Sequence, residues 1–63
     1  RLIRAALDSL PEEQRTAVIL HRFHGLKYQE IADATGSSLA AVEARIHRAK
    51  GRLAVLLAEY MKE

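Results

Sequence analysis

The chain has 63 residues, which is enough for one domain with one small hydrophobic core. It contains no cysteine, so a disulfide framework and a thiolate metal site are both excluded. Its 49% hydrophobic and 29% charged residues are ordinary for a globular domain and disfavour disorder. The composition and the lack of cysteine fit a cytoplasmic protein. No apolar run reaches the roughly 18 residues that cross a bilayer, so no membrane contact is expected. The chain begins at Arg1, and we interpret residues 1–63 as a single domain of a longer protein.

One proline and three glycines punctuate the sequence, and none lies in a strand-like alternation, so all elements are predicted to be helical. Pro11 suits the first turn of a second helix, where a missing N–H costs nothing. We expect this helix to run to about His24 and to end at Gly25, a residue that adopts left-handed backbone easily. The first helix precedes Pro11 and has its apolar residues on one face: Leu2, Ile3, Ala6, Leu7 and Leu10.

A short third helix is predicted over Tyr28 to about Thr35. Gly36 ends it, because glycine reaches positive φ at little cost. Ser37 or Ser38 can cap the next helix by accepting a backbone N–H, and we favour Ser38.

The last helix is predicted to be long, over about residues 39–61. Its apolar residues alternate at spacings of three and four, which places them on one stripe. We expect the first half of the stripe to pack on the core of the domain. The second half either packs on the first helix or binds another protein. The stripe consists of Leu39, Val42, Ile46, Ala49, Leu53, Leu56 and Tyr60.

The third and fourth helices, joined by a short turn, match a helix-turn-helix over about residues 28–50. In this motif the second helix enters the DNA major groove with its N-terminal residues on base edges. Other helical hairpins share the spacing, and a basic helix face is often simply solvated, so these alternatives remain open. The face opposite the apolar stripe, at about 100° per residue, begins small and becomes basic: Ala40, Ala44, His47, Arg48 and Gly51.

Three motifs, in this order, cover most of the chain. They are Leu10-Pro11-Glu12-Glu13-Gln14-Arg15, Gly25-Leu26-x-Tyr28-x-Glu30-Ile31-Ala32 and Val42-x-x-Arg45-Ile46-x-Arg48-Ala49-Lys50. Together they resemble region 4, the C-terminal promoter-recognition domain of bacterial sigma factors, and most closely the extracytoplasmic-function type. The resemblance extends over about residues 5–57.

The resemblance implies an all-α, four-helix domain that binds double-stranded promoter DNA. Such domains recognise the upstream (minus-35) element as part of the RNA polymerase holoenzyme and contact the flap of the polymerase β subunit. An anti-sigma protein can cover them. From the helix face and the resemblance, the DNA base-edge candidates are Ala40, Glu43, Ala44, His47 and Arg48. The DNA backbone candidates are His21, Tyr28, Gln29, Ser38, Arg45 and Arg52. For Arg45 a structural ion pair is the alternative.

The chain departs from the family pattern in its recognition helix. Where the family commonly has Thr-Val-Lys/Arg-Ser-Arg, this chain has Ala41-Val42-Glu43-Ala44-Arg45. The Glu43 carboxylate can accept a hydrogen bond from a cytosine amino group, or it can repel phosphates. His21 stands where a basic residue is usual, and Lys27 where a capping Ser or Thr is usual. The DNA sequence that the family reads therefore does not transfer to this chain.

A second hypothesis is a protein-interaction module that binds an anti-sigma factor or a polymerase subunit instead of DNA. Enzymatic activity is not expected, because there is no cysteine and the carboxylates are scattered. His21, His24 and His47 suggest a metal only weakly, since no acidic or thiolate pattern accompanies them, so neither a metal nor a cofactor is expected. The candidates for a partner surface are Leu56, Leu57, Tyr60 and Met61, of which Leu57 and Met61 are expected to be exposed.

Overall fold

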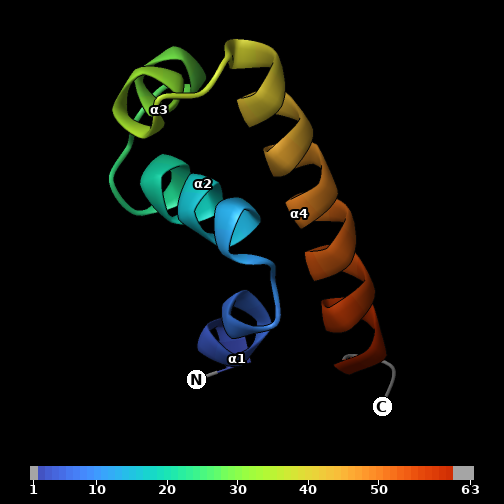
Figure 1. The fold of residues 1–63 in the computed structure, drawn as a ribbon. Helices are drawn as coiled ribbons and strands as arrows, with labels where there is room; N and C mark the ends of the chain where they lie inside the picture. The colour runs from blue at the N-terminus through green and yellow to red at the C-terminus, as the bar shows by residue number, and fades with distance from the viewer. Residues whose placement is uncertain (1, 61–63) are drawn as a thin grey trace.

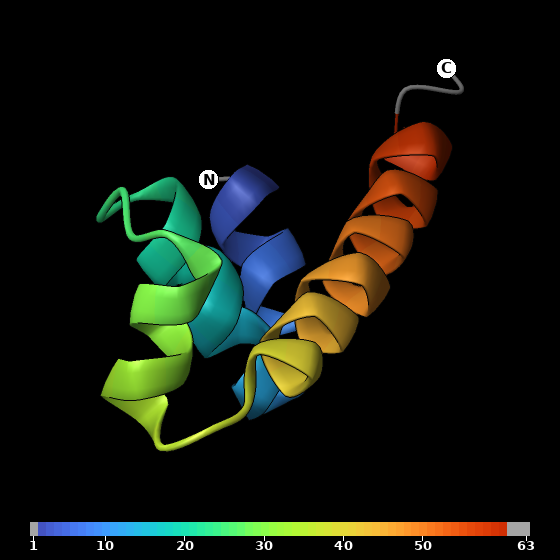
Figure 2. The ribbon, with the colours of Figure 1, turned by 90° about the horizontal axis from the view of Figure 1, so that it is seen from above.

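The computed structural model describes residues 2–60, except for the side chains of residues 2, 59 and 60, and it confirms an all-α fold. One long helix runs along one side of the molecule and three shorter helices lie beside it (Figure 1). Figure 2 shows that the long helix leaves the other three towards its C-terminal end. The helices are α1 (Leu2–Asp8), α2 (Glu12–Arg22), α3 (Tyr28–Thr35) and α4 (Leu39–Tyr60).

Helix α2 is shorter at both ends than predicted. Pro11 is not in its first turn but is the N-cap, with extended backbone at φ −55° and ψ 150°. At the other end Phe23 is the C-cap, so the prediction that the helix reaches His24 is wrong. Gly25 nevertheless has the left-handed φ of 71° that was expected of it. The turn that contains Gly25 is longer than predicted, because α2 ends before His24.

This turn brings Leu26 back to the domain. Its backbone N–H donates a hydrogen bond to the carbonyl of Leu20, at 3.1 Å, and its side chain is half-buried against the core. A left-handed glycine followed by an inward apolar residue is a common way to end a helix. The turn therefore sets where α3 begins relative to α2.

The boundaries of α3 and the start of α4 are as predicted. Gly36 has a φ of 68°, which reverses the chain after α3. Ser38 caps α4, because its Oγ accepts the backbone N–H of Ala41 at 3.1 Å. At the start of α3, the side chain of Lys27 cannot accept a hydrogen bond. There the carboxylate of Glu30 accepts the backbone N–H of Lys27 instead, at 2.7 Å.

The core lies where α2, α3 and α4 meet. Ile31 and Val42 are the largest fully buried side chains, and burying side chains of this size stabilises a fold by about 1.5–3 kcal/mol each. Small residues of α2 and α3 let the three helices approach closely. The core cluster consists of Ala17, Ile31, Ala32, Val42 and Ile46, with Val18, Leu20, Leu26 and Tyr28 packed against it.

The predicted apolar stripe of α4 is core only in its middle. Val42, Ile46 and Ala49 are buried. Leu39 is 40% exposed, so its assignment to the core is wrong; it lies in the first turn of α4, before the helix reaches its neighbours. Further along, Leu53 and Leu56 are only half-buried. Helix α4 is thus held to the domain by its central turns.

Candidate nucleic-acid interface

The first half of α4 presents the predicted base-edge candidates on its outer side. Ala40, Glu43, His47 and Arg48 are exposed, and Ala44 is half-buried. The face therefore begins with small side chains, which allow the helix backbone to approach another surface closely. The longer polar side chains follow one and two turns later.

The basic side chains of α4 are concentrated beyond this start. Arg48, Lys50 and Arg52 are exposed, and in residues 2–60 none of them makes a side-chain hydrogen bond or an ion pair. Their charges are therefore available to an anionic ligand. The only acid between residues 34 and 58 is Glu43. Clustered, unneutralised basic side chains on one helix are the electrostatic footprint of phosphate binding.

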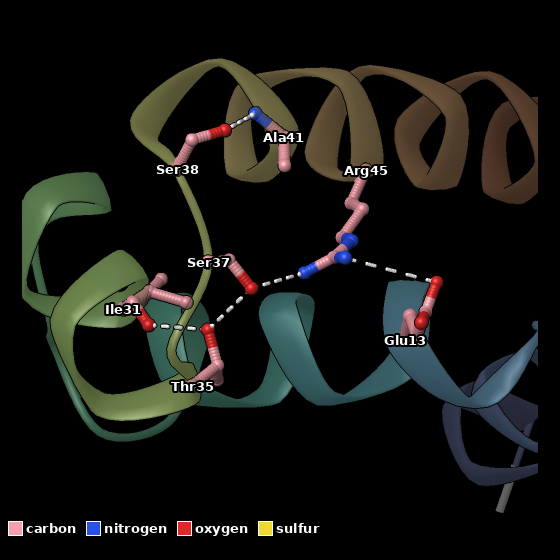
Figure 3. Close-up of polar contacts among 7 residues, drawn as sticks. All are labelled: Glu13, Ile31, Thr35, Ser37, Ser38, Ala41 and Arg45. Carbon is pink, nitrogen blue, oxygen red and sulfur yellow. Dashed lines mark hydrogen bonds and ion pairs between the residues drawn. The ribbon is translucent and has the colours of Figure 1, made fainter.

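Arg45 is used inside the domain, unlike the other arginines of this helix segment. Its Nη1 donates to Oγ of Ser37 at 2.7 Å, and its Nη2 lies 3.8 Å from Oε1 of Glu13 in α2 (Figure 3). The Arg45 side chain is 25% exposed, against 75% for Glu13, so the ion pair itself contributes little. These contacts favour the structural role for Arg45 that the sequence left open.

Hydrogen bonds continue from Ser37 into α3. The hydroxyls of Thr35 and Ser37 are 3.0 Å apart, and Thr35 donates to the carbonyl of Ile31 at 2.7 Å. Because a hydroxyl has a single proton, Ser37 is the donor between the two hydroxyls whenever Thr35 donates to Ile31. We call the side chains of Glu13, Thr35, Ser37 and Arg45 the Arg45 clasp. It connects α2, the end of α3 and α4, and so helps to set the angle of the helix-turn-helix.

Two of the predicted backbone candidates lie together where α2 ends and α3 begins. The rings of His21 and Tyr28 meet edge to face, with centroids 5.0 Å apart and planes at 71°. Nδ1 of His21 is 3.0 Å from the carbonyl of Leu26, and a carbonyl can only accept, so Nδ1 carries the proton. The neutral ring then has only an acceptor left at Nε2. A phosphate contact from His21 therefore requires the protonated ring.

The remaining backbone candidates lie at the starts of α3 and α4. Gln29 is exposed and donates from its side-chain amide to the carboxylate of Asp33 at 3.1 Å. Ser38 is also exposed, and its Oγ is occupied as the acceptor of the α4 cap. Its hydroxyl proton remains available to a phosphate oxygen, whereas Gln29 keeps one amide proton.

An apolar groove lies between α1, α2 and α4, and sequence reasoning missed it. Its volume is about 470 Å³. Two side chains that line it, Ile3 and Phe23, are 61% and 60% exposed although their spacing had suggested packed helix faces. Lys50 and Arg22 contribute positive charge. The groove is lined by Ile3, Ala6, Leu7, Val18, His21, Arg22, Phe23, Ile46, Lys50, Leu53 and Leu57.

Of the two described side chains in the predicted partner surface on α4, Leu57 lines this groove and Leu56 does not. Leu57 is half-buried, so the expectation that it is exposed is wrong. Leu56 is also half-buried. The side chain of Tyr60, and Met61 as a whole, lie outside the described residues.

Two negative observations apply to the described part of the chain. No group of three or more His, Asp or Glu side chains in residues 2–60 is placed to hold a metal ion. Within the same range, no helix combines the length and the apolar character that a membrane crossing needs.

The fold and the exposed face of α4 define a helix-turn-helix domain with a basic recognition helix. Residues 1–53 match the family described as sigma-70, region 4, and the chain belongs to this family.

Curated relatives agree with this assignment. Over 61 residues the chain is 46% identical to "ECF RNA polymerase sigma factor SigE" of Mycolicibacterium smegmatis, covering 97% of this chain and 24% of that protein. It is 41% identical over 54 residues to "ECF RNA polymerase sigma factor EcfG" of Rhodopseudomonas palustris, covering 86% and 30%. The identity to "RNA polymerase sigma factor SigV" of Bacillus subtilis is 46% over 44 residues, covering 70% and 26%. The chain thus spans about a quarter to a third of the length of these relatives.

Proposed function

We propose that this chain is the promoter-recognition domain of an alternative sigma factor in the cytoplasm. In this role it binds the upstream (minus-35) element and directs RNA polymerase to initiate transcription, without enzymatic activity of its own. The observation that carries the proposal is the outer face of α4, which is small at its start and becomes basic beyond it, with an Arg48 side chain that makes no ion pair in the described part of the chain. The family and the names of the relatives support the same role.

The order of side chains along α4 suits entry into the major groove. Ala40 and Ala44 keep the helix start narrow, so the backbone can come close to the bases. Arg48 is long enough to pair with a guanine edge or a phosphate, and Arg52 is placed for the sugar-phosphate backbone further along. Phosphate contacts position a protein on DNA, and base contacts give it specificity.

The test uses the full-length protein in complex with polymerase core and two promoter duplexes. One duplex has an intact upstream element, and the other has the same bases in scrambled order. We expect the intact element to bind at least about tenfold more tightly, because each mismatched base pair costs about 1–3 kcal/mol. Scrambling an equally long segment outside the element is the control. Equal affinity for the intact and scrambled elements would contradict the proposal.

The apolar groove favours a second role, which can coexist with the first. It exposes Ile3 and Phe23 on a folded domain and has the basic side chains of Arg22 and Lys50 in its lining. An amphipathic helix with an apolar face and acidic flanks would complement this surface. We propose that a helix of the polymerase β flap, or of an anti-sigma factor, binds in this groove.

Replacing Phe23 by serine tests this second role. The side chain is 60% exposed, so the fold should tolerate the change. We expect the affinity of the full-length protein for polymerase core to fall about tenfold, since burying an aromatic side chain is worth about 1.5–3 kcal/mol. Val55→Ser is the matched control, because Val55 is 59% exposed and does not line the groove. Equal effects of the two changes in this titration would exclude the groove as the binding site for polymerase core.

A further inference from the structure

Glu43 is the one acidic residue among the base-edge candidates of α4, and its charge opposes DNA binding. It is the only acid between residues 34 and 58, and it is exposed in the second turn of α4. A carboxylate stabilises the positive end of a helix only within the first turn, and Ser38 already caps this end. In residues 2–60 the side chain makes no hydrogen bond and no ion pair. Helix stability therefore gives no account of an acid at this position.

The nearest arginine in sequence does not neutralise this carboxylate. Arg45 is held in the Arg45 clasp, where Ser37 and Glu13 take up its guanidinium. The residue one turn after Glu43 on the same side is His47, which is exposed. Ala40, one turn before it, is small and exposed. An uncompensated negative charge thus stands between a small and a polar side chain, on the part of α4 that would face the bases.

A carboxylate can only accept hydrogen bonds, so it needs a donor in the major groove. The donors there are the amino groups of cytosine and adenine. Adenine places its N7 acceptor beside the amino group, and this acceptor repels the second carboxylate oxygen. Cytosine presents its amino group without a neighbouring acceptor on the same base, and carboxylates pair with it in major-groove recognition. At guanine, at thymine and at phosphates Glu43 finds acceptors and no hydrogen-bond donor.

We infer that Glu43 is a specificity-determining residue that reads the amino group of one cytosine in the upstream element. The inference rests on the proposed function, because it requires α4 to lie in the major groove. His47 follows Glu43 by four residues, or about 6 Å along the helix axis. Base pairs are about 3.4 Å apart, so contacts from His47 fall about two base pairs from that cytosine. Glu43 raises selectivity in two ways, since it binds the cytosine and penalises every sequence without it.

The test is a selection of bound sequences from a duplex library randomised over the upstream element. It uses the full-length protein in the polymerase holoenzyme, as wild type and as Glu43→Gln. We expect the wild type to enrich cytosine at one position. In Glu43→Gln this position should shift to adenine, which a glutamine side chain pairs with through N6 and N7, while the other positions stay the same. Affinity of the variant for the cytosine site should fall about tenfold.

Glu12→Gln is the matched control, because it removes the same charge from an exposed position at the start of α2. It should leave the enriched motif unchanged. If Glu43→Gln enriches the same motif as the wild type, or binds all sequences more tightly to the same degree, the inference is overturned and the proposed function stands. If the wild type enriches no motif, the proposed function fails, and the inference fails with it.

Discussion

Replacing Ile31 by alanine is expected to lower the free energy of unfolding by about 2–5 kcal/mol. Ile31 is 1% exposed and packs among core residues of α2 and α4, so the change removes buried methyl groups and leaves a cavity. A single core in a domain of this size supplies only about 3–5 kcal/mol in total. Much of the variant should therefore be unfolded at 25 °C. Circular dichroism of the 63-residue domain during urea and thermal unfolding measures the effect.

Two further variants calibrate this result. Ile31→Val removes one methylene and should cost only about 0.5–1.5 kcal/mol. Val55→Ala changes a residue that is 59% exposed and should cost less still. If Ile31→Ala were no more destabilising than Val55→Ala, the assignment of the core would be wrong.

The largest effect on DNA binding is expected from Arg48→Glu. Arg48 is exposed and makes no side-chain bond or ion pair with residues 2–60, so its replacement should leave the fold intact. The variant loses an attraction and gains a repulsion, and we expect promoter affinity to fall about 100-fold at low salt. The slope of log affinity against log salt concentration should also become shallower by about two, because reversing one charge removes one attraction to phosphate and adds one repulsion. Fluorescence titrations of the holoenzyme at several salt concentrations measure both quantities.

Arg4→Glu is the matched control for charge. Arg4 is exposed in α1, away from the outer face of α4. Because both changes replace arginine by glutamate, the two variants have the same net charge. Its affinity should change only through the overall charge of the domain. Similar losses for the two variants would mean that binding is non-specific attraction and that α4 has no special role.

Sequence reasoning succeeded where a local signal decides the structure. The start and end of α3 and the cap at Ser38 depend on residues within one turn of each other. The sequence predicts the end of α2 too late because Gly25 suggests an immediate stop, whereas Phe23 caps the helix. A glycine marks a turn, but it does not say how many residues separate the turn from the last helical one.

Features that depend on distant residues were not predictable in the same way. The use of Arg45 within the domain depends on Glu13, which lies in another helix. Likewise, periodicity places Ile3 and Phe23 among apolar positions, but it does not say whether another helix covers them. Leu39 shows the same limit, because the stripe begins one turn before the core does. The groove is therefore a product of how the helices are arranged.

The proposed function requires that the start of α4 lies against the bases of the upstream promoter element. A photoreactive amino acid in place of Ala40, which is exposed at that start, tests it most directly in the full-length holoenzyme on promoter DNA. The same amino acid in place of Val55, exposed in the second half of α4, is the control. We predict that position 40 crosslinks to bases of the upstream element and that position 55 does not. Crosslinks from position 40 to protein alone, or equal DNA crosslinking from both positions, would contradict this position of α4.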